Sequence, residues 1–206
     1  MRRIRVVEVL GNSEGGGATF VMNLIESLEP GRFDVTLIAP EATWLAERCA
    51  AARAQYLPMP LMSSRMSRTL RARLATALRE AAPDIIHAHG TRAAWYVMGR
   101  IPSGERRPAF LYSEHLFSFD ARRGVARLPW YAIEWALCRR ADAVLTSAPV
   151  NARRLLAMGW ATPERIGCDR VGFPAESVRR QVEHPAPRAL LGVEDGARLV
   201  GGVGRL

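Results

Sequence analysis

The sequence predicts an α/β domain with a doubly wound, mostly parallel sheet of the Rossmann-like type. Short runs rich in β-branched residues alternate along the chain with segments whose apolar residues recur at helical spacing. This alternation is typical of parallel strands joined by crossover helices, which cover both faces of the sheet. The 206 residues, 49% apolar and 24% charged, also suffice for one large or two small domains with a hydrophobic core.

In the N-terminal half, each short apolar strand precedes a helix with one apolar stripe. Pro30-Gly31 forms a turn before the second strand, prolines end the third strand, and Pro83 ends the third helix. The expected elements are a strand over 4–10, a helix over 18–28, a strand over 33–39, a helix over 44–54, a short strand within 54–60 and a helix over 67–82.

In the C-terminal half the alternation continues, and helix-end signals set the boundaries. Pro129 suits the first turn of a helix, and Arg139-Arg140 places cations where the helix dipole favours them. Ser147 is expected to cap the next helix and Gly159 to end it. The expected elements are a strand over 84–90, a helix over 91–99, a strand over 109–115, a helix from 129 to 140, a strand over 141–147, a helix ending at 158 and a strand over 165–173.

The amino-acid composition of the chain changes after Pro174. The segment "AESVRRQVEHPAPRALLGVEDG" is polar and broken by prolines, like a linker, and "ARLVGGVGRL" then begins a fresh strand. We therefore expect one domain over 1–176, followed over 177–206 by a linker and the first strand of a C-terminal domain that the chain lacks.

The charge pattern argues against a nucleic-acid partner. The formal net charge is +9, and all 29 basic residues are arginine. They are spread along the chain, with no basic arm and no zinc-finger spacing, so we expect no nucleic acid. The arginine-rich helix over 67–82 is interpreted as a solvated face, although an anionic membrane surface would attract it.

Cysteine usage and hydropathy predict the compartment. Cys49, Cys138 and Cys168 are odd in number and far apart, which argues against a disulfide framework and against a CxxC metal knuckle. No window reaches the roughly 18 apolar residues of a membrane span. We expect a cytoplasmic protein, with peripheral contact at the inner face of the membrane as an extension of that prediction.

The stretch "VLGNSEGGGATFVMNLIESL" places Gly15, Gly16 and Gly17 between the first strand and the first helix. A helix N-terminus offers free backbone N–H groups to a phosphate, and glycine permits close approach. The spacing is not GxGxxG, and no lysine is present for a Walker loop, so NAD binding and ATP hydrolysis are disfavoured. The alternative is a tight turn that needs glycine for its own geometry.

Two histidines end the strand of "DIIHAHG". His87 and His89 alternate with Ala88, so their side chains share one face. A metal pair is disfavoured, because Asp84 lies at the far end of the strand and the spacing offers no third ligand. His87 is expected to be a packed, hydrogen-bonded residue, whereas for His89 a site role and a structural role stay open.

The segment "SEHLFSFD" places Glu114 and His115 where the next strand ends, at the edge where open α/β sheets bind ligands. His115 is predicted to contact the ligand. Glu114 either orients His115 or pairs with an arginine. The next apolar residues along the chain suggest a ligand that is polar on one side and apolar on the other; they are Leu116, Phe117 and Phe119.

Taken in order, the motifs resemble the N-terminal domain of retaining glycosyltransferases of family 4, whose GT-B fold has two Rossmann-like domains facing a cleft. The similar segments are "GGATFVMNLIESL", "DIIHAHG", "YSEHLFS", "RRADAVLTSAPVNARRLLAMG" and "LVGGVGRL". The resemblance covers almost the whole chain. One departure is the loop Val171-Gly172-Phe173-Pro174, where the family usually carries an asparagine-glycine pair.

The resemblance implies roles for several residues. Gly16 and Gly17 match the glycine pair that borders the donor diphosphate and the acceptor, and His115 matches the histidine that reaches the transferred sugar. Such enzymes need no metal ion, in accord with the lack of a DxD motif, and they use a nucleotide-sugar as substrate rather than a cofactor. The residues that grip the nucleotide belong to the second domain.

These observations predict the acceptor-side half of a glycosyltransferase that is inactive as this chain alone. The acceptor implied by the resemblance is a glycan or a lipid-linked glycan. Two alternatives stay open: a non-catalytic half-enzyme that binds a partner or a membrane surface, and a sugar-nucleotide epimerase, which can share the two-domain architecture.

Overall fold

The computed structural model describes residues 2–62, 67–104 and 107–168, with isolated residues between 175 and 198. The chain divides into two compact units, Met1–Gly172 and Phe173–Leu206. The loop 171–174 and, apart from the isolated positions, the expected linker and strand over 177–206 lie outside the described residues. Their prediction is therefore neither confirmed nor contradicted.

A sheet of seven strands in the order β3-β2-β1-β4-β5-β6-β7 forms the centre of the first unit, and every neighbouring pair is parallel. This confirms the predicted fold class. The strands are β1 (Ile4–Leu10), β2 (Phe33–Ala39), β3 (Gln55–Pro58), β4 (Ile85–His89), β5 (Ala109–Glu114), β6 (Ala143–Thr146) and β7 (Ile166–Cys168).

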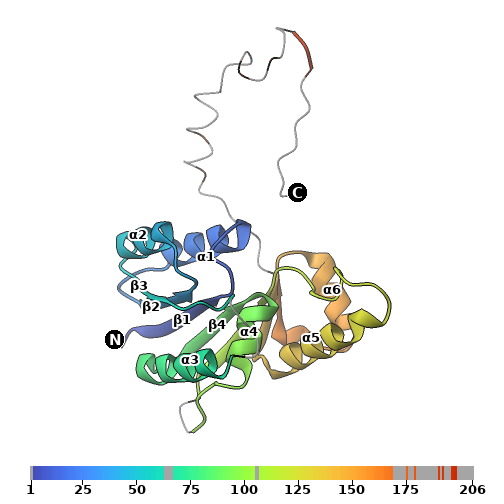
Figure 1. The fold of residues 1–206 in the computed structure, drawn as a ribbon, viewed down its shortest axis with the longest axis horizontal. Helices are drawn as coiled ribbons and strands as arrows, with labels where there is room; N and C mark the ends of the chain where they lie inside the picture. The colour runs from blue at the N-terminus through green and yellow to red at the C-terminus, as the bar shows by residue number, and fades with distance from the viewer. Residues whose placement is uncertain are drawn as a thin grey trace. The chain divides into compact units, whose positions relative to one another are not determined.

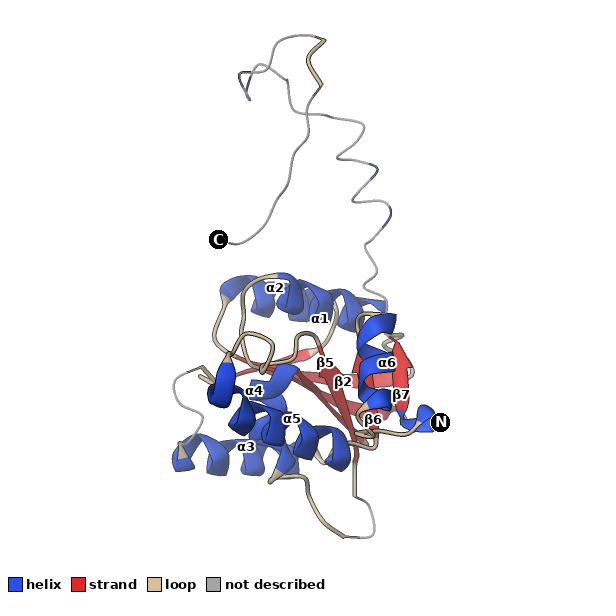
Figure 2. Ribbon diagram, turned by 90° about the vertical axis from the view of Figure 1, so that its right-hand side faces the viewer, coloured by secondary structure: helices blue, strands red, loops and turns tan. Residues whose placement is uncertain are grey.

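Helices lie on both faces of the sheet. In Figures 1 and 2, α1 and α2 lie on one side, and α3, α4 and α5 lie on the other. Leu155 of α6 joins the core on the α5 side. The α-helices of the described residues are α1 (Gly16–Ser27), α2 (Thr43–Ala51), α3 (Arg68–Ala81), α4 (Gly90–Met98), α5 (Leu128–Arg140) and α6 (Pro149–Ala157).

Each face of the sheet has its own core, because side chains alternate along the strands. Val7 and Val9 of β1 belong to the core under α3, α4 and α5, whereas Leu10 belongs to the core under α1 and α2. The apolar stripe predicted for the third helix is fully buried; its members are Leu70, Leu74 and Leu78.

The start of α6 differs from the prediction. The residue before the helix is Ala148, which makes no side-chain cap, and Ser147 lies one residue earlier. Pro149 occupies the first turn, where its fixed φ suits the helix and its missing N–H leaves one donor fewer to satisfy. The prediction that Ser147 caps this helix is therefore wrong.

On the side of α1 and α2, part of the sheet stays uncovered by the described residues. Ile85, Leu111, Leu145 and Gly167, from β4 to β7, are half-buried and line an apolar groove there. Glu8 and His87 also line this groove, at the border of the covered part. These two polar residues therefore lie where the covered and the open parts of the sheet meet.

Candidate active site

Glu8 brings two histidines together in the middle of the sheet. β1 pairs with β4 so that Glu8 lies opposite His87, and His89 follows two residues later on the same face. The Oε2 atom of Glu8 lies 3.0 Å from Nδ1 of His87 and 2.7 Å from Nε2 of His89. All three side chains are buried. These residues form one hydrogen-bonded cluster.

His115 extends this cluster to the carboxyl edge of the sheet. Its Nε2 atom lies 3.3 Å from Nδ1 of His89, and the two rings are stacked with centroids 5.5 Å apart. Phe20 of α1 packs edge-on against His115 at 5.4 Å. Since Phe20 lies one turn after Gly16, the predicted glycine motif and the predicted catalytic histidine lie on neighbouring elements of the same edge.

Sequence analysis did not identify Glu8 as the carboxylate that binds the two histidines. Local spacing offered no carboxylate near His87 and His89, because Glu8 is contributed by a neighbouring strand far away in sequence. The available signal was a glutamate with apolar residues on both sides of it in the strand, in the run "VVEVL". His87 itself fits the expected packed role, because its Nε2 atom also makes a hydrogen bond of 2.8 Å with Oγ of Ser113.

The cluster contains a donor set that could hold a metal ion, since one atom each of Glu8, His87 and His89 lies within 4.8 Å of the others. Tetrahedral zinc ligands at 2.0–2.1 Å from the ion lie about 3.3 Å from one another. The contacts of Glu8 with the two histidines, 3.0 and 2.7 Å, are shorter. The geometry therefore fits direct hydrogen bonds better than it fits a metal centre.

Burial and neighbouring charges set the protonation of the cluster. Burial raises the pKa of Glu8, but the interactions with His87 and His89 outweigh burial and lower this pKa to about 2. Burial, followed by the electrostatic effect of His87, lowers the pKa of His89 to about 4. The same two causes lower the pKa of His115. At neutral pH, Glu8 is ionised while His89 and His115 are uncharged.

The three glycines of the motif have different structural requirements. Gly15 has φ 79° and ψ −172°, a conformation that is almost restricted to glycine. Its carbonyl oxygen accepts the first hydrogen bonds of α1, from Ala18 and Thr19. A Cβ atom added to Gly16 or Gly17 would meet nothing within 4 Å. The tight-turn explanation therefore covers Gly15 but not the other two, whose N–H groups begin the helix.

Alanine substitutions should separate these roles. We expect Gly15→Ala to destabilise the domain by about 1–3 kcal/mol, because alanine is strained at this φ and ψ. Gly16→Ala should leave stability unchanged or raise it by about 0.4–1 kcal/mol, because it restricts the unfolded chain without a clash. Urea unfolding of the two variants measures the difference, and equal losses would contradict it.

Glu114 lies on the opposite face of the sheet from His115. Its Oε2 atom accepts a hydrogen bond of 3.0 Å from Nδ2 of Asn151 in α6, and its Oε1 atom is buried with no partner among the described residues. Burial is the main cause that raises the pKa of Glu114 to about 7, with Glu134 and Asp120 adding to the rise. We find no direct contact through which Glu114 would orient His115.

This raised pKa predicts a pH dependence of stability. The folded state holds the Glu114 proton up to about pH 7, whereas the unfolded chain releases it near 4.5. Stability should therefore fall as pH rises through this window. Glu114→Gln should remove that fall, because glutamine stays neutral. Urea unfolding of both proteins across the window tests this, and the difference between them cancels the opposite contributions of His89 and His115, whose pKa values are lowered.

The loop after His115 is fixed by Glu134 of α5. The carboxyl group of Glu134 accepts hydrogen bonds from Oγ1 of Thr91 at 2.6 Å, from the Tyr112 hydroxyl at 2.6 Å and from the Ser118 N–H at 3.1 Å. All three contacts lie in buried or partly buried surroundings. Sequence analysis did not identify Glu134, because its partners lie on three different elements.

The apolar residues after His115 point mostly inward. Phe117 and Phe119 are buried in the core, where Arg154 lies 5.0 and 4.8 Å from their ring centres. Leu116 is 72% exposed. The expectation that all three meet a ligand is therefore wrong for the two phenylalanines, which instead pack the loop against α5 and α6 and leave Leu116 at the rim.

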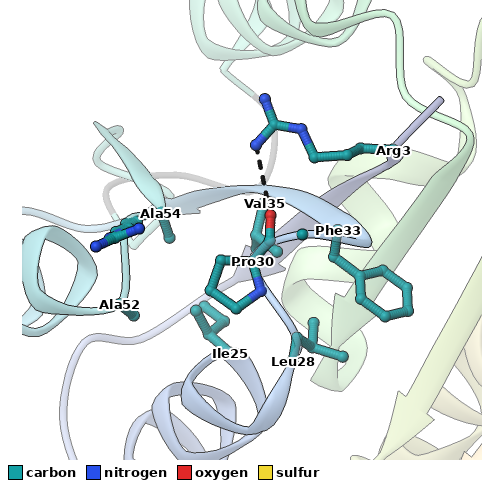
Figure 3. A pocket seen from close by; sticks show the side chains of 10 residues that line it. Arg3, Ile25, Leu28, Pro30, Phe33, Val35, Ala52 and Ala54 are labelled. Carbon is teal, nitrogen blue, oxygen red and sulfur yellow. Dashed lines mark hydrogen bonds between the residues drawn. The ribbon is translucent and has the colours of Figure 1, made fainter. Parts of the chain in front are cut away.

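A separate hollow lies at the amino end of β2, away from this cluster. It is lined by Leu28, Pro30 and Phe33 on one side and by Ala52 and Ala54 on the other (Figure 3). Arg3 donates a hydrogen bond of 3.5 Å to the carbonyl oxygen of Pro30 across it. Open α/β sheets bind ligands at the carboxyl ends of their strands, so the hollow is not the candidate site.

The order of these elements matches one protein family. The profile of Glycosyltransferase Family 4 matches residues 14–168, more than half of the 206-residue chain. The chain belongs to glycosyltransferase family 4. In this family 4 domain the match begins just before the three glycines and continues through β7, so it includes Gly16, Gly17 and His115.

Solved structures share the fold of the family 4 domain at low sequence identity. Anabaena Alr3699/HepE, in complex with UDP, has a TM-score of 0.59 and 14% identity over 88% of this chain and 50% of its own. Sucrose-phosphate synthase from Thermosynechococcus elongatus has a TM-score of 0.58 and 15% identity, over 89% of this chain and 53% of its own. A UDP-N-acetylglucosamine 2-epimerase has a TM-score of 0.54 and 16% identity, over 80% of this chain and 47% of its own. The chain thus spans about half the length of these structures.

Two further searches, for similar curated proteins and for helices of the described residues that could span a membrane, found none. Among curated proteins, no sequence is significantly similar to it. Within the part of the chain that the structure describes, no helix has the length and apolarity needed to cross a membrane.

Proposed function

We propose that this domain is the acceptor-side half of a retaining glycosyltransferase, which moves a sugar from a nucleotide-sugar donor to a glycan or lipid-linked acceptor. The family match carries this proposal. It is supported by the position of His115 beside α1, through Phe20, at the edge where the helix begins with Gly16 and Gly17.

In the proposed reaction, the bond between the anomeric carbon and the donor diphosphate breaks, and a bond to an acceptor oxygen forms. The acceptor hydroxyl passes its proton to the departing diphosphate oxygen, which takes the electron pair of the broken bond, and the nucleoside diphosphate leaves. Gly16 and Gly17 would donate backbone N–H groups to the diphosphate at the positive end of α1. His115 would contact the transferred sugar. We propose that these dipoles, with arginines, act without a metal ion.

The nucleotide-binding residues are proposed to lie on a second domain. This chain matches only 50% and 53% of the length of two solved relatives, and nucleotide recognition needs a largely enclosed pocket. We therefore expect this chain alone to bind UDP-, GDP- and ADP-sugars weakly or not at all and to transfer no sugar. Calorimetric titration tests the binding, and micromolar affinity for any of these donors would overturn the half-site proposal.

A protein that joins this chain to a second α/β domain tests the activity itself. We expect release of nucleoside diphosphate that depends on a glycan or lipid-linked acceptor. The main competitor is an epimerase, because epimerases share the fold. Conversion of UDP-N-acetylglucosamine to its 2-epimer without an acceptor would favour the epimerase. Absence of both reactions, with donor and acceptor still bound, would favour the non-catalytic binding module.

We also propose a cytoplasmic location with peripheral contact at the membrane. Arg68, Arg73 and Arg79 of α3 are exposed, and an anionic leaflet attracts such a helix. Cosedimentation with vesicles that contain anionic lipid should exceed that with zwitterionic vesicles. Replacing the three arginines by glutamine should remove the difference, and equal sedimentation of both vesicle types with the parent chain would contradict the proposal.

A further inference from the structure

The buried cluster connects directly to the histidine at the rim. One line of contacts runs from Oε2 of Glu8 to Nε2 of His89 over 2.7 Å, and from Nδ1 of His89 to Nε2 of His115 over 3.3 Å. Glu8 is 1% exposed and His89 is 3% exposed, so solvent does not compete for these contacts. The state of the buried pair therefore decides which hydrogen-bonding role His115 adopts.

Counting protons along this line gives one arrangement. An ionised carboxylate only accepts hydrogen bonds, so Nε2 of His89 must carry the proton that it donates to Glu8. A neutral imidazole has one N–H, so Nδ1 of His89 must accept, and the donor is Nε2 of His115. A neutral His115 is then left without a proton on Nδ1, which has no hydrogen-bond partner among the described residues.

His87 holds the carboxylate in this arrangement from a second side. Its Nδ1 atom donates to Glu8 at 3.0 Å, and its Nε2 atom makes a hydrogen bond of 2.8 Å with Oγ of Ser113. Along the line from Glu8 to a neutral His115, every other protonation pattern requires either a protonated Glu8 or a charged His89. The lowered pKa values of Glu8, about 2, and of His89, about 4, disfavour both at neutral pH.

We propose that Glu8 and His89 are positioning residues that hold His115 as the Nε2–H tautomer, with Nδ1 as a hydrogen-bond acceptor at the rim. An uncharged acceptor nitrogen binds a hydroxyl group and repels a phosphate oxygen, which has no proton to donate. His115 is thereby assigned to a sugar hydroxyl, and the diphosphate is left to the N-terminus of α1. The tautomer rests on the contacts of the cluster and on an ionised Glu8, whereas the assignment to a sugar hydroxyl rests on the proposed function.

Nitrogen-15 NMR of the histidines in this chain tests the tautomer without any activity. The chain has four histidines, so few signals need assignment. At neutral pH we expect His89 and His115 to be protonated on Nε2 only. Finding His115 charged, or protonated on Nδ1, would overturn the proposal. This measurement on the unsubstituted chain does not depend on whether a variant folds.

Two substitutions test the origin of the tautomer. Glu8→Gln removes the obligate acceptor while keeping the shape, so His89 and His115 should become mixtures of tautomers. Ser113→Ala is the matched control: it removes a partner of His87 from the same cluster but leaves the line to His115 intact, so those two signals should not change. Unaltered tautomers in Glu8→Gln would contradict the proposed relay.

Zinc titration followed by the same spectra tests whether Glu8, His87 and His89 bind a metal ion instead. We expect no saturable change at stoichiometric Zn²⁺. Tight binding that shifts His87 and His89 together would identify a metal centre and overturn the relay, because a metal on Nε2 of His89 reverses the hydrogen bond to His115.

In the two-domain enzyme, Glu8→Gln should lower kcat by roughly 10-fold to 100-fold, by analogy with the loss of the hydrogen-bond partner that orients a metal-bound histidine. The pH at which activity falls on the acid side should also move, which a merely structural role would not cause. An unchanged kcat and pH profile would overturn the catalytic role. If the two-domain parent shows no transfer, the proposed function fails while the NMR result still stands.

Discussion

His115→Ala is expected to lower the turnover of the two-domain enzyme by about 10²-fold to 10³-fold, the usual cost of losing one positioned polar contact to a transition state. The side chain ends the line from Glu8 through His89 to the rim. It contributes little to folding, because His115 is only partly buried. The measurement is kcat and KM for donor and acceptor, together with the urea midpoint.

His115→Asn provides the matched control for this prediction. Its amide oxygen can accept a hydrogen bond near the position of Nδ1, so it should recover part of the lost turnover. Leu116→Ala, which removes an exposed neighbour, controls for general disturbance of the loop. Turnover equal to that of the parent in His115→Ala would assign His115 to structure. Equal losses in the alanine and asparagine variants would contradict its role as an acceptor.

The fold could be predicted because its signals are local. β-Branched runs, apolar stripes and proline or glycine stops all lie within one element, and they placed the described strands and α-helices close to their observed positions. The short 3₁₀ helices Gly124–Arg127 and Pro163–Arg165 were not predicted, and the predicted cap of α6 was wrong. Serine before a helix is a strong signal, but Pro149 shifted the start of the helix by one residue.

The candidate site was harder to predict, because strand order creates it. His89 ends β4 and His115 directly follows β5, so both could be recognised from their positions, and β4 and β5 are indeed neighbours. Glu8 could not be found in this way. It meets His87 only because β1 pairs with β4 across a long separation in sequence. Glu134 was missed for the same reason, since its three partners come together only in the folded domain.

Glu134→Ala is expected to destabilise the domain by roughly 3–5 kcal/mol. The substitution removes the acceptor for three groups at once, the hydroxyls of Thr91 and Tyr112 and the N–H of Ser118. A buried donor left without its partner costs about 1–3 kcal/mol, and entry of water into the space reduces the sum. Urea unfolding measures the loss, and Glu80→Ala on the exposed part of α3 should change stability by about 0.5 kcal/mol or less.

Glu134 should also affect the site through the loop that follows His115. Ser118 lies three residues beyond His115, and its N–H is held by Glu134 at 3.1 Å. Glu134→Gln keeps an acceptor oxygen, so it should fold with a smaller loss of stability. Because the amide makes a weaker bond than a carboxyl group, exchange of the Ser118 amide hydrogen should quicken more than exchange within β4. If amide exchange quickened equally across the domain, Glu134 would contribute only to global stability. An increase confined to Ser118 would show that Glu134 holds the loop that follows His115.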